Sequence, residues 1–247
     1  MKSPLIVALA GAIGGAALAV AVLFAAAAFG VFPPGNDARI HGYLTSHPEL
    51  LAEMSNRLQA QQEDRDDAAR QVAVQKLGRA AFFNPRLAFM FGPKNARATF
   101  VEFFDYNCPY CRASLPAVKK FIANHQKDTR FAFIEFPIKG PRSTIAARAA
   151  IAARKQPDKY LAFHFRLMDE KALVTEDVVY ADAAKSGLDI AKLKADMEGE
   201  DVDAAISAAH NLAIAANIDG TPAFIINGRA HEGALDDADL RKLLTAS

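Results

Sequence analysis

The chain has 247 residues, a formal net charge of +1 and a composition that is 51% hydrophobic, which is enough for a sizeable core. Acids and bases interleave along the sequence without forming a basic stripe, so no nucleic-acid partner is expected. The only cysteines, Cys108 and Cys111, exclude a scaffold of several disulfides and leave redox chemistry or metal binding as the role of the pair.

Residues 1–35 are expected to form a transmembrane anchor or signal segment. The run from Leu5 to Phe32 lacks charged and strongly polar residues, and at ~1.5 Å per helical residue it is long enough for a ~30 Å hydrocarbon core. Lys2 precedes it, which by the positive-inside rule predicts that everything after Gly35 is translocated into an oxidising compartment. We favour an uncleaved helix that anchors the chain in a membrane; a cleaved signal peptide is the alternative.

Residues 36–80 are expected to form a helical arm. A first helix, capped by Asn36 or Asp37, carries apolar residues at mostly helical spacings: Ile40, Leu44, Leu51, Met54 and Leu58. A strongly polar helical stretch follows from Gln59 to Gln71. The apolar face needs a partner, which is either another copy of the chain, giving a homo-oligomer through residues 37–71, or the chain's own globular domain.

Residues 81–247 are expected to form one α/β domain. The pattern predicts a buried strand at Ala98–Phe104, a helix from Pro109 to Ala123, a strand at Phe131–Phe136 and helices over about 141–216. Two strands around the Asn227-Gly228 hairpin signal and a last helix, from Asp236 or Asp237 to near Leu244, complete it. The order is β-α-β, a helical insertion, then β-β-α.

Cys108 is predicted to lie where the first helix of this domain begins. Free backbone N–H groups and the helix dipole lower the pKa of a thiol at that place, and Pro109 suits the first helical position. Cys111, one turn on, is placed to resolve a mixed disulfide. Structural zinc needs four ligands, and the sequence has no second cysteine pair to supply the other two. A metal site is therefore less favoured than a redox role, and no metal ligands are assigned.

Several segments resemble the DsbA-like branch of thioredoxin-fold thiol-disulfide oxidoreductases. They are Phe100–Cys111, Phe136-Pro137-Ile138, Gly140–Ser143, the alanine-rich helix and Gly220–Gly228. The arm is similar, more loosely, to that of the bacterial periplasmic ScsC-type members. The resemblance implies a thioredoxin fold with a helical insertion, covering roughly Phe82 to Leu244.

The resemblance also implies roles for individual residues. Thr221 and Pro222 match the cis-proline loop that presents backbone to substrate; a plain proline at a strand start is the alternative. Glu102 matches a buried acid that relays protons to the cysteines, unless it faces solvent from a strand edge. Tyr110 matches the variable position that tunes the thiolate, or is only a packing aromatic.

Two further residues concern the surroundings of the cysteines. Glu135 stands where relatives often carry a basic residue, which predicts a more negative field and weaker stabilisation of the thiolate. Tyr106, together with Tyr110, is expected to be exposed beside the site as part of an apolar surface for unfolded chains.

The expected function is thiol-disulfide exchange on cysteines of secreted proteins, as oxidase or isomerase. The expected partners are unfolded or misoxidised periplasmic proteins and a DsbB-like or DsbD-like membrane redox protein. No cofactor is expected beyond a redox-active Cys108–Cys111 disulfide. The alternatives are a periplasmic copper or zinc binding protein that uses the same thiolates, and a chaperone in which the cysteines are incidental.

Overall fold

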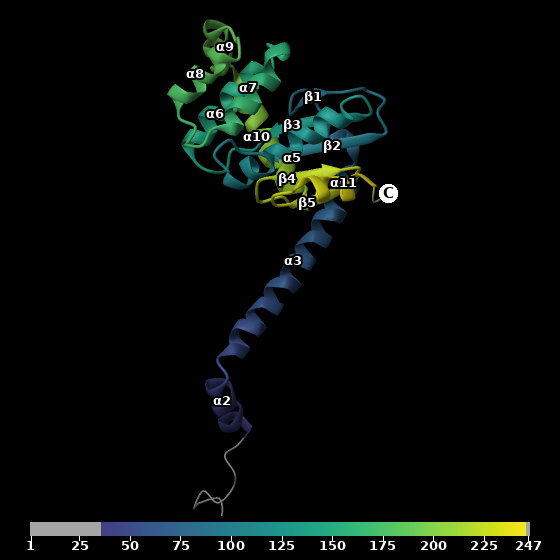
Figure 1. The fold of residues 1–247 in the computed structure, drawn as a ribbon, viewed down its shortest axis with the longest axis vertical. Helices are drawn as coiled ribbons and strands as arrows, with labels where there is room; N and C mark the ends of the chain where they lie inside the picture. The colour runs from purple at the N-terminus through teal and green to yellow at the C-terminus, as the bar shows by residue number, and fades with distance from the viewer. Residues whose placement is uncertain (1–35, 246–247) are drawn as a thin grey trace, which may run out of the picture. The chain divides into compact units, whose positions relative to one another are not determined.

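The computed structural model describes residues 36–245 (Figure 1), so the predicted membrane segment lies outside the described part. The chain divides into two compact units between Gln62 and Glu63. Among the described residues, no helix has both the length and the apolar character needed to cross a membrane.

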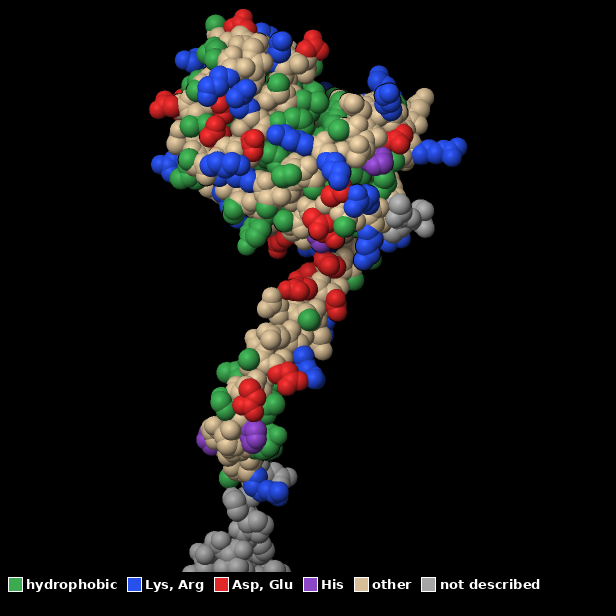
Figure 2. Space-filling model, viewed as in Figure 1, with side chains coloured by type: hydrophobic (Ala, Val, Ile, Leu, Met, Phe, Trp, Pro, Cys, Tyr) green, Lys and Arg blue, Asp and Glu red, His purple; other side chains and the backbone are tan. Residues whose placement is uncertain are grey.

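The first unit contains helix α2 (Asn36–Ser46) and the first turns of helix α3 (Glu49–Leu77). Its large apolar side chains are exposed, among them Ile40, Leu51 and Met54 at 55%, 76% and 61%. Figure 2 shows hydrophobic side chains at the surface around α2 and the start of α3. Because Leu51, Met54 and Leu58 are spaced by three and four residues, they share one helix face. Within residues 36–245, this face is therefore largely uncovered.

The second unit begins earlier than the sequence indicated, at Glu63 rather than near residue 81. The polar end of α3 belongs to it because Arg70 and Val74 are buried there. Arg70 Nε donates to the carbonyl oxygen of Asn217 at 3.1 Å, and Gln71 Nε2 donates to that of Gly228 at 2.8 Å. Long-range hydrogen bonds, which a helical pattern does not reveal, thus bring this segment into the domain.

A five-stranded sheet forms the centre of the second unit, in the order β1-β3-β2-β4-β5. The strands are β1 (Phe89–Phe91), β2 (Ala98–Phe104), β3 (Thr129–Glu135), β4 (Ala223–Ile226) and β5 (Arg229–Glu232). The central strand β2 is parallel to β3 and antiparallel to β4. The β4–β5 turn has positive φ at both central residues, 51° at Asn227 and 79° at Gly228, as a type I′ hairpin requires.

The sheet is covered on both faces, which explains the nearly continuous apolar run of β2. Phe100 and Phe104 share a core with helices α5 (Pro109–His125) and α11 (Asp237–Thr245). Val101 and Phe103 share the opposite core with the end of α3, with α4 (Arg79–Phe82) and with α10 (Glu200–Ala215). Alternate residues of one strand therefore stabilise two separate cores.

The helical insertion lies between β3 and β4. It consists of α6 (Pro141–Ala153), α7 (Pro157–Asp169), α8 (Glu176–Lys185), α9 (Ile190–Met197) and α10, and α6 to α9 gather on one side of the sheet (Figure 1). Buried alanines along α6 allow neighbouring helices to approach closely. Because β2 and β3 are parallel, the insertion starts at the same edge of the sheet as α5, beside the cysteines.

Candidate active site

Cys108 lies at the junction between strand β2 and helix α5. It has an extended conformation, φ −82° and ψ 120°, and is the residue that caps the helix, with Pro109 in the first turn. Its backbone N–H donates to the carbonyl oxygen of Asp105 at 3.0 Å, which closes the turn between strand and helix. The sequence therefore places the sulfur at the positive end of the helix by local structure alone.

Residues distant in the sequence complete the surroundings of the sulfur. Cys108 and Cys111 are buried free thiols, and in its protonated form Cys108 Sγ donates to the carbonyl oxygen of Thr221 at 3.0 Å. The Thr221–Pro222 peptide bond is cis. Strand β4, which follows it, pairs with β2 through Ala223 and Phe103, so the sheet register holds the loop against the cysteines.

The pKa values of the two thiols are shifted in opposite directions. A hydrogen bond from Cys111 is the largest influence that lowers the pKa of Cys108, from 9.0 to about 5, against the opposing effect of burial. The side chain of Thr221 and the backbone of Cys111 and Tyr110 lower it further. Burial, the hydrogen bond with Cys108 and the nearby charge of Glu102 raise the pKa of Cys111. One sulfur is therefore a thiolate near neutral pH while the other keeps its proton.

Glu102 is buried beneath the cysteines, 3% exposed, on the β2 face that carries Phe100 and Phe104. The alternative of a side chain facing solvent is therefore wrong. Burial raises the pKa of Glu102 to about 8. A carboxyl with this pKa exchanges a proton near neutral pH, as a relay to Cys111 requires.

Glu135 does not weaken the thiolate as the sequence suggested. The side chain is buried, but it forms an ion pair with Arg154 and accepts a hydrogen bond from Tyr160 Oη at 2.7 Å. The negative charge is thus compensated within the helical insertion, and the pKa of Cys108 is lowered. Arg154 is the residue immediately after α6. Its contact with Glu135 could not be foreseen from the local sequence around Glu135.

The two tyrosines beside the cysteines differ in exposure. Tyr110 is 64% exposed, whereas Tyr106 is 1% exposed, so the prediction of an exposed Tyr106 is wrong. Tyr106 Oη is hydrogen-bonded to Nδ1 of the buried His164 on α7, at 3.0 Å. Leu173, 54% exposed, adds an apolar side chain near the site, because its neighbour Val174 donates its N–H to Asn107 Oδ1 at 2.8 Å.

Asp105 organises this edge of the sheet, a role that the sequence analysis missed. The Oδ1 atom accepts from the N–H of Asn107 and from Ser143 Oγ, both at 2.7 Å. The Oδ2 atom accepts from the N–H groups of Ile138 and Lys139, at 2.8 and 2.9 Å. Aspartate in turns commonly accepts a hydrogen bond from the backbone N–H two residues further on, here that of Asn107. This turn preference was the one signal in the sequence that pointed to a structural role for Asp105. The other donors lie beyond β3, so the carboxylate joins the active-site turn to the start of the insertion.

Among residues 36–245, no group of three or more histidine, cysteine or acidic side chains is arranged to hold a metal ion. The structure brings together the predicted site residues, which are Cys108, Pro109, Tyr110, Cys111, Glu102 and the Thr221–Pro222 loop. Such a site can exchange disulfides through two thiols of different acidity.

Comparison with known proteins agrees with this geometry. Residues 86–246 match the family model described as thioredoxin, so the chain belongs to the thioredoxin family. A thioredoxin-like oxidoreductase from Silicibacter pomeroyi DSS-3 is 37% identical, with a TM-score of 0.63 over 68% of this chain and 95% of that one. Proteus mirabilis ScsC, in a transitional conformation, is 27% identical, with a TM-score of 0.62 over 84% of this chain and 91% of that one. The resemblance to DsbA- and ScsC-type proteins is thereby confirmed.

The curated relatives are longer proteins. A Na⁺/H⁺ antiporter NhaA from Herminiimonas arsenicoxydans is 29% identical over 164 residues, which are 66% of this chain and 26% of the antiporter. The chain thus spans about a quarter of the length of the curated relatives that it matches.

Proposed function

We propose that this protein is a thiol-disulfide oxidoreductase that acts on cysteines of periplasmic proteins. The observation that carries the proposal is the position of Cys108 at the start of α5, one helical turn before the buried thiol of Cys111; there the pKa of Cys108 is lowered and that of Cys111 is raised. A thiolate is the nucleophile in disulfide exchange, and a neighbouring thiol is needed to release the captured substrate.

The exchange takes place in two steps. The Cys108 thiolate attacks a substrate disulfide, forms a mixed disulfide and releases one substrate thiolate. Cys111, after losing its proton to the ionised form of Glu102, attacks the Cys108 sulfur, closes the Cys108–Cys111 bond and releases the second substrate thiolate. The substrate gains two electrons; in the reverse direction a substrate dithiol is oxidised and the cysteine pair is reduced. The protein pair itself acts as the redox group, and no other cofactor takes part.

The acidity of Cys108 supports net oxidation of substrates. The pKa of Cys108 is lowered to about 5, so the thiolate is stabilised. Because Cys108 is a thiolate only in the reduced pair, the reduced pair is stabilised relative to the disulfide. Equilibration with glutathione tests this direction. We expect a reduction potential nearer to the value of roughly −120 mV found for DsbA than to roughly −270 mV for thioredoxin. A value at the thioredoxin end would indicate reductase work instead.

The backbone of the Thr221–Pro222 loop and the exposed apolar side chains of Tyr110 and Leu173 offer an extended substrate segment both hydrogen-bonding groups and apolar contact. The proposed substrates are unfolded or misoxidised secreted proteins. The proposed redox partner is a DsbB-like or DsbD-like membrane protein, and residues 1–35 are proposed to anchor the chain to the inner membrane.

The first unit is proposed to form an oligomer with further copies of the chain. The support is the exposed apolar face of α3 that contains Leu51, Met54 and Leu58, since a second copy offers a complementary face. The substitutions L51Q, M54Q and L58Q together test this better than deletion of residues 37–71, because deletion removes the buried Arg70. Sedimentation should show oligomers of the parent and a monomer of the triple variant; a parent that is monomeric at micromolar concentration contradicts the proposal.

Replacing Cys108 by serine tests the enzymatic assignment directly. We expect Cys108→Ser to abolish both the oxidation of a reduced model protein and the rearrangement of a scrambled one. Cys111→Ser should instead accumulate a mixed disulfide, because Cys108 still attacks but nothing releases the adduct. Undiminished exchange by Cys108→Ser would refute the proposed function.

A further inference from the structure

A hollow lies at the edge of the sheet opposite to the cysteines. Thr99 and Thr129, at the starts of the parallel strands β2 and β3, contribute to its lining, whereas Cys108 follows the other end of β2. The five residue steps from Thr99 to Phe104 correspond to roughly 17 Å at about 3.3 Å per residue. The hollow is therefore separate from the redox site.

The inner part of the hollow is apolar. A cavity of about 230 Å³ lies between the end of α3, helix α4 and the sheet, and its walls include Val74, Phe82, Phe83, Val101 and Ile225. An apolar cavity of roughly 150 Å³ in a protein admits benzene. This cavity therefore has room for an apolar group somewhat larger than a benzene ring.

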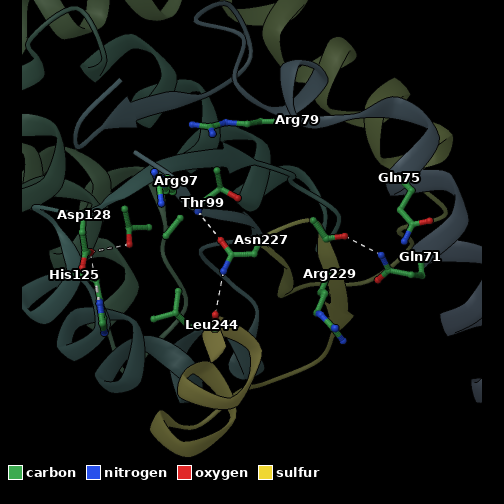
Figure 3. Close-up of a pocket in the computed structure, with 13 residues that line it drawn as sticks. Gln71, Gln75, Arg79, Arg97, Thr99, His125, Asp128, Asn227, Arg229 and Leu244 are labelled. Carbon is green, nitrogen blue, oxygen red and sulfur yellow. Dashed lines mark hydrogen bonds and ion pairs between the residues drawn. The ribbon is translucent and has the colours of Figure 1, made fainter. Parts of the chain in front are cut away.

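The mouth of the hollow is basic. A groove of about 990 Å³ adjoins the cavity, sharing Gln75, Arg79, Thr99 and Gly228 with it. Figure 3 shows Arg79, Arg97 and Arg229 around the groove, each from a different segment of the chain. The one acidic residue among its lining residues, Asp128, lies 3.6 Å from His125 Nδ1. The groove thus carries an excess of positive charge.

Hydrogen bonds hold several residues of the groove in place, and Arg79 lies at its boundary with the cavity. Arg79 donates to the carbonyl oxygen of Ala96 at 3.0 Å, and its guanidinium carbon lies 5.4 Å from the centre of the Phe83 ring. Asn227 accepts from the Thr99 N–H at 2.9 Å and donates to the Leu244 carbonyl oxygen at 3.1 Å (Figure 3). Among the described residues, no carboxylate is paired with any of the three arginines of the groove.

We propose that this hollow binds a small amphipathic carboxylate, with its apolar tail in the cavity and its carboxylate on Arg79. A guanidinium recognises a carboxylate with two parallel hydrogen bonds, and Arg97 and Arg229 add attraction for the anion. An uncharged apolar molecule would leave the arginines unused, and a small inorganic anion would leave the cavity unused. A tail of about six to eight carbons suits the cavity volume.

Calorimetric titration of the full-length protein with straight-chain carboxylates, from acetate to dodecanoate, tests the apolar part. Each added CH₂ should tighten binding about fourfold while the tail still enters the cavity, from a transfer free energy of ~0.8 kcal/mol per CH₂. The increase should stop near octanoate, and octanol should bind at least tenfold more weakly than octanoate. Affinity independent of tail length, or octanol binding as tightly as octanoate, would overturn the proposal.

Arg79→Gln tests the charged part. Arg79 is exposed, so the variant should fold normally and bind octanoate at least tenfold more weakly, because a hydrogen bond to a charged group contributes ~1.5–3 kcal/mol. Arg86→Gln, which changes an exposed arginine outside the groove, is the matched control and should bind like the parent. Equal affinity of Arg79→Gln and the parent would refute the site, as would tighter binding of a short peptide than of octanoate. Disulfide exchange should be unchanged in both variants, so this test is independent of the proposed function.

Discussion

Replacing Glu102 by glutamine should stabilise the protein, although it alters a buried residue beneath the cysteines. Burial alone raises the pKa of Glu102 from 4.5 to about 8. Between these values the folded state retains a proton that the unfolded chain has released, so the free energy of unfolding falls as pH rises through this window. At ~1.36 kcal/mol per pH unit, the carboxyl lowers stability by about 3 kcal/mol at pH 7 and about 5 kcal/mol above pH 8.

Denaturant unfolding of the parent and Glu102→Gln, both reduced, over pH 4 to 9 measures this effect. We expect equal stability near pH 4 and a growing advantage of the variant up to pH 8, because glutamine fills the same space without a charge to bury. Taking the difference between the two proteins removes the contributions of groups that titrate equally in both. A variant that gains nothing between pH 5 and 8, or gains equally at every pH, would refute the reasoning.

Glu135 is the matched control, because it is also buried on the same face of the neighbouring strand. It differs from Glu102 in having partners, the Arg154 guanidinium and the Tyr160 hydroxyl. Removing one member of a buried ion pair leaves the other uncompensated and costs about 3–5 kcal/mol. Glu135→Gln should therefore destabilise the protein where Glu102→Gln stabilises it.

Three further predictions concern the active-site edge. The rate of Cys108 alkylation by iodoacetamide should rise with a midpoint near pH 5, with Cys111 protected, and a midpoint above pH 7 would contradict the lowered pKa. Thr221→Val should raise that midpoint and Thr221→Ser should not, because the side chain of Thr221 lowers the pKa of Cys108; coincident profiles of all three proteins would exclude this role. Asp105→Ala should lower the free energy of unfolding by about 3–5 kcal/mol, since its four hydrogen-bond donors lose a charged acceptor. Ser143→Ala removes one of those donors and is the control; urea unfolding should show its free energy of unfolding lowered by only about 1 kcal/mol. A loss as small as this for Asp105→Ala would contradict the prediction.

Local patterns predicted much of the fold correctly. The strand at Ala98–Phe104 has the predicted bounds, and the helix that begins at Pro109 continues to His125, two residues beyond its predicted end. The three-residue strand β1 was missed because Phe89–Phe91 is too short to show a periodicity. The end of α3 was assigned to an arm because its many charges resemble a solvated helix, yet Arg70 reaches Asn217 and Glu232.

The sequence by itself determined the position of Cys108 at a helix start and the one-turn spacing to Cys111, because both depend on neighbouring residues only. Tertiary structure decided which charges act there: it paired Glu135 with Arg154, enclosed Glu102 in the core and buried Tyr106 against His164. The physical reason is that pKa values depend on burial and on charges within a few ångströms, and residues from distant parts of the chain supply both.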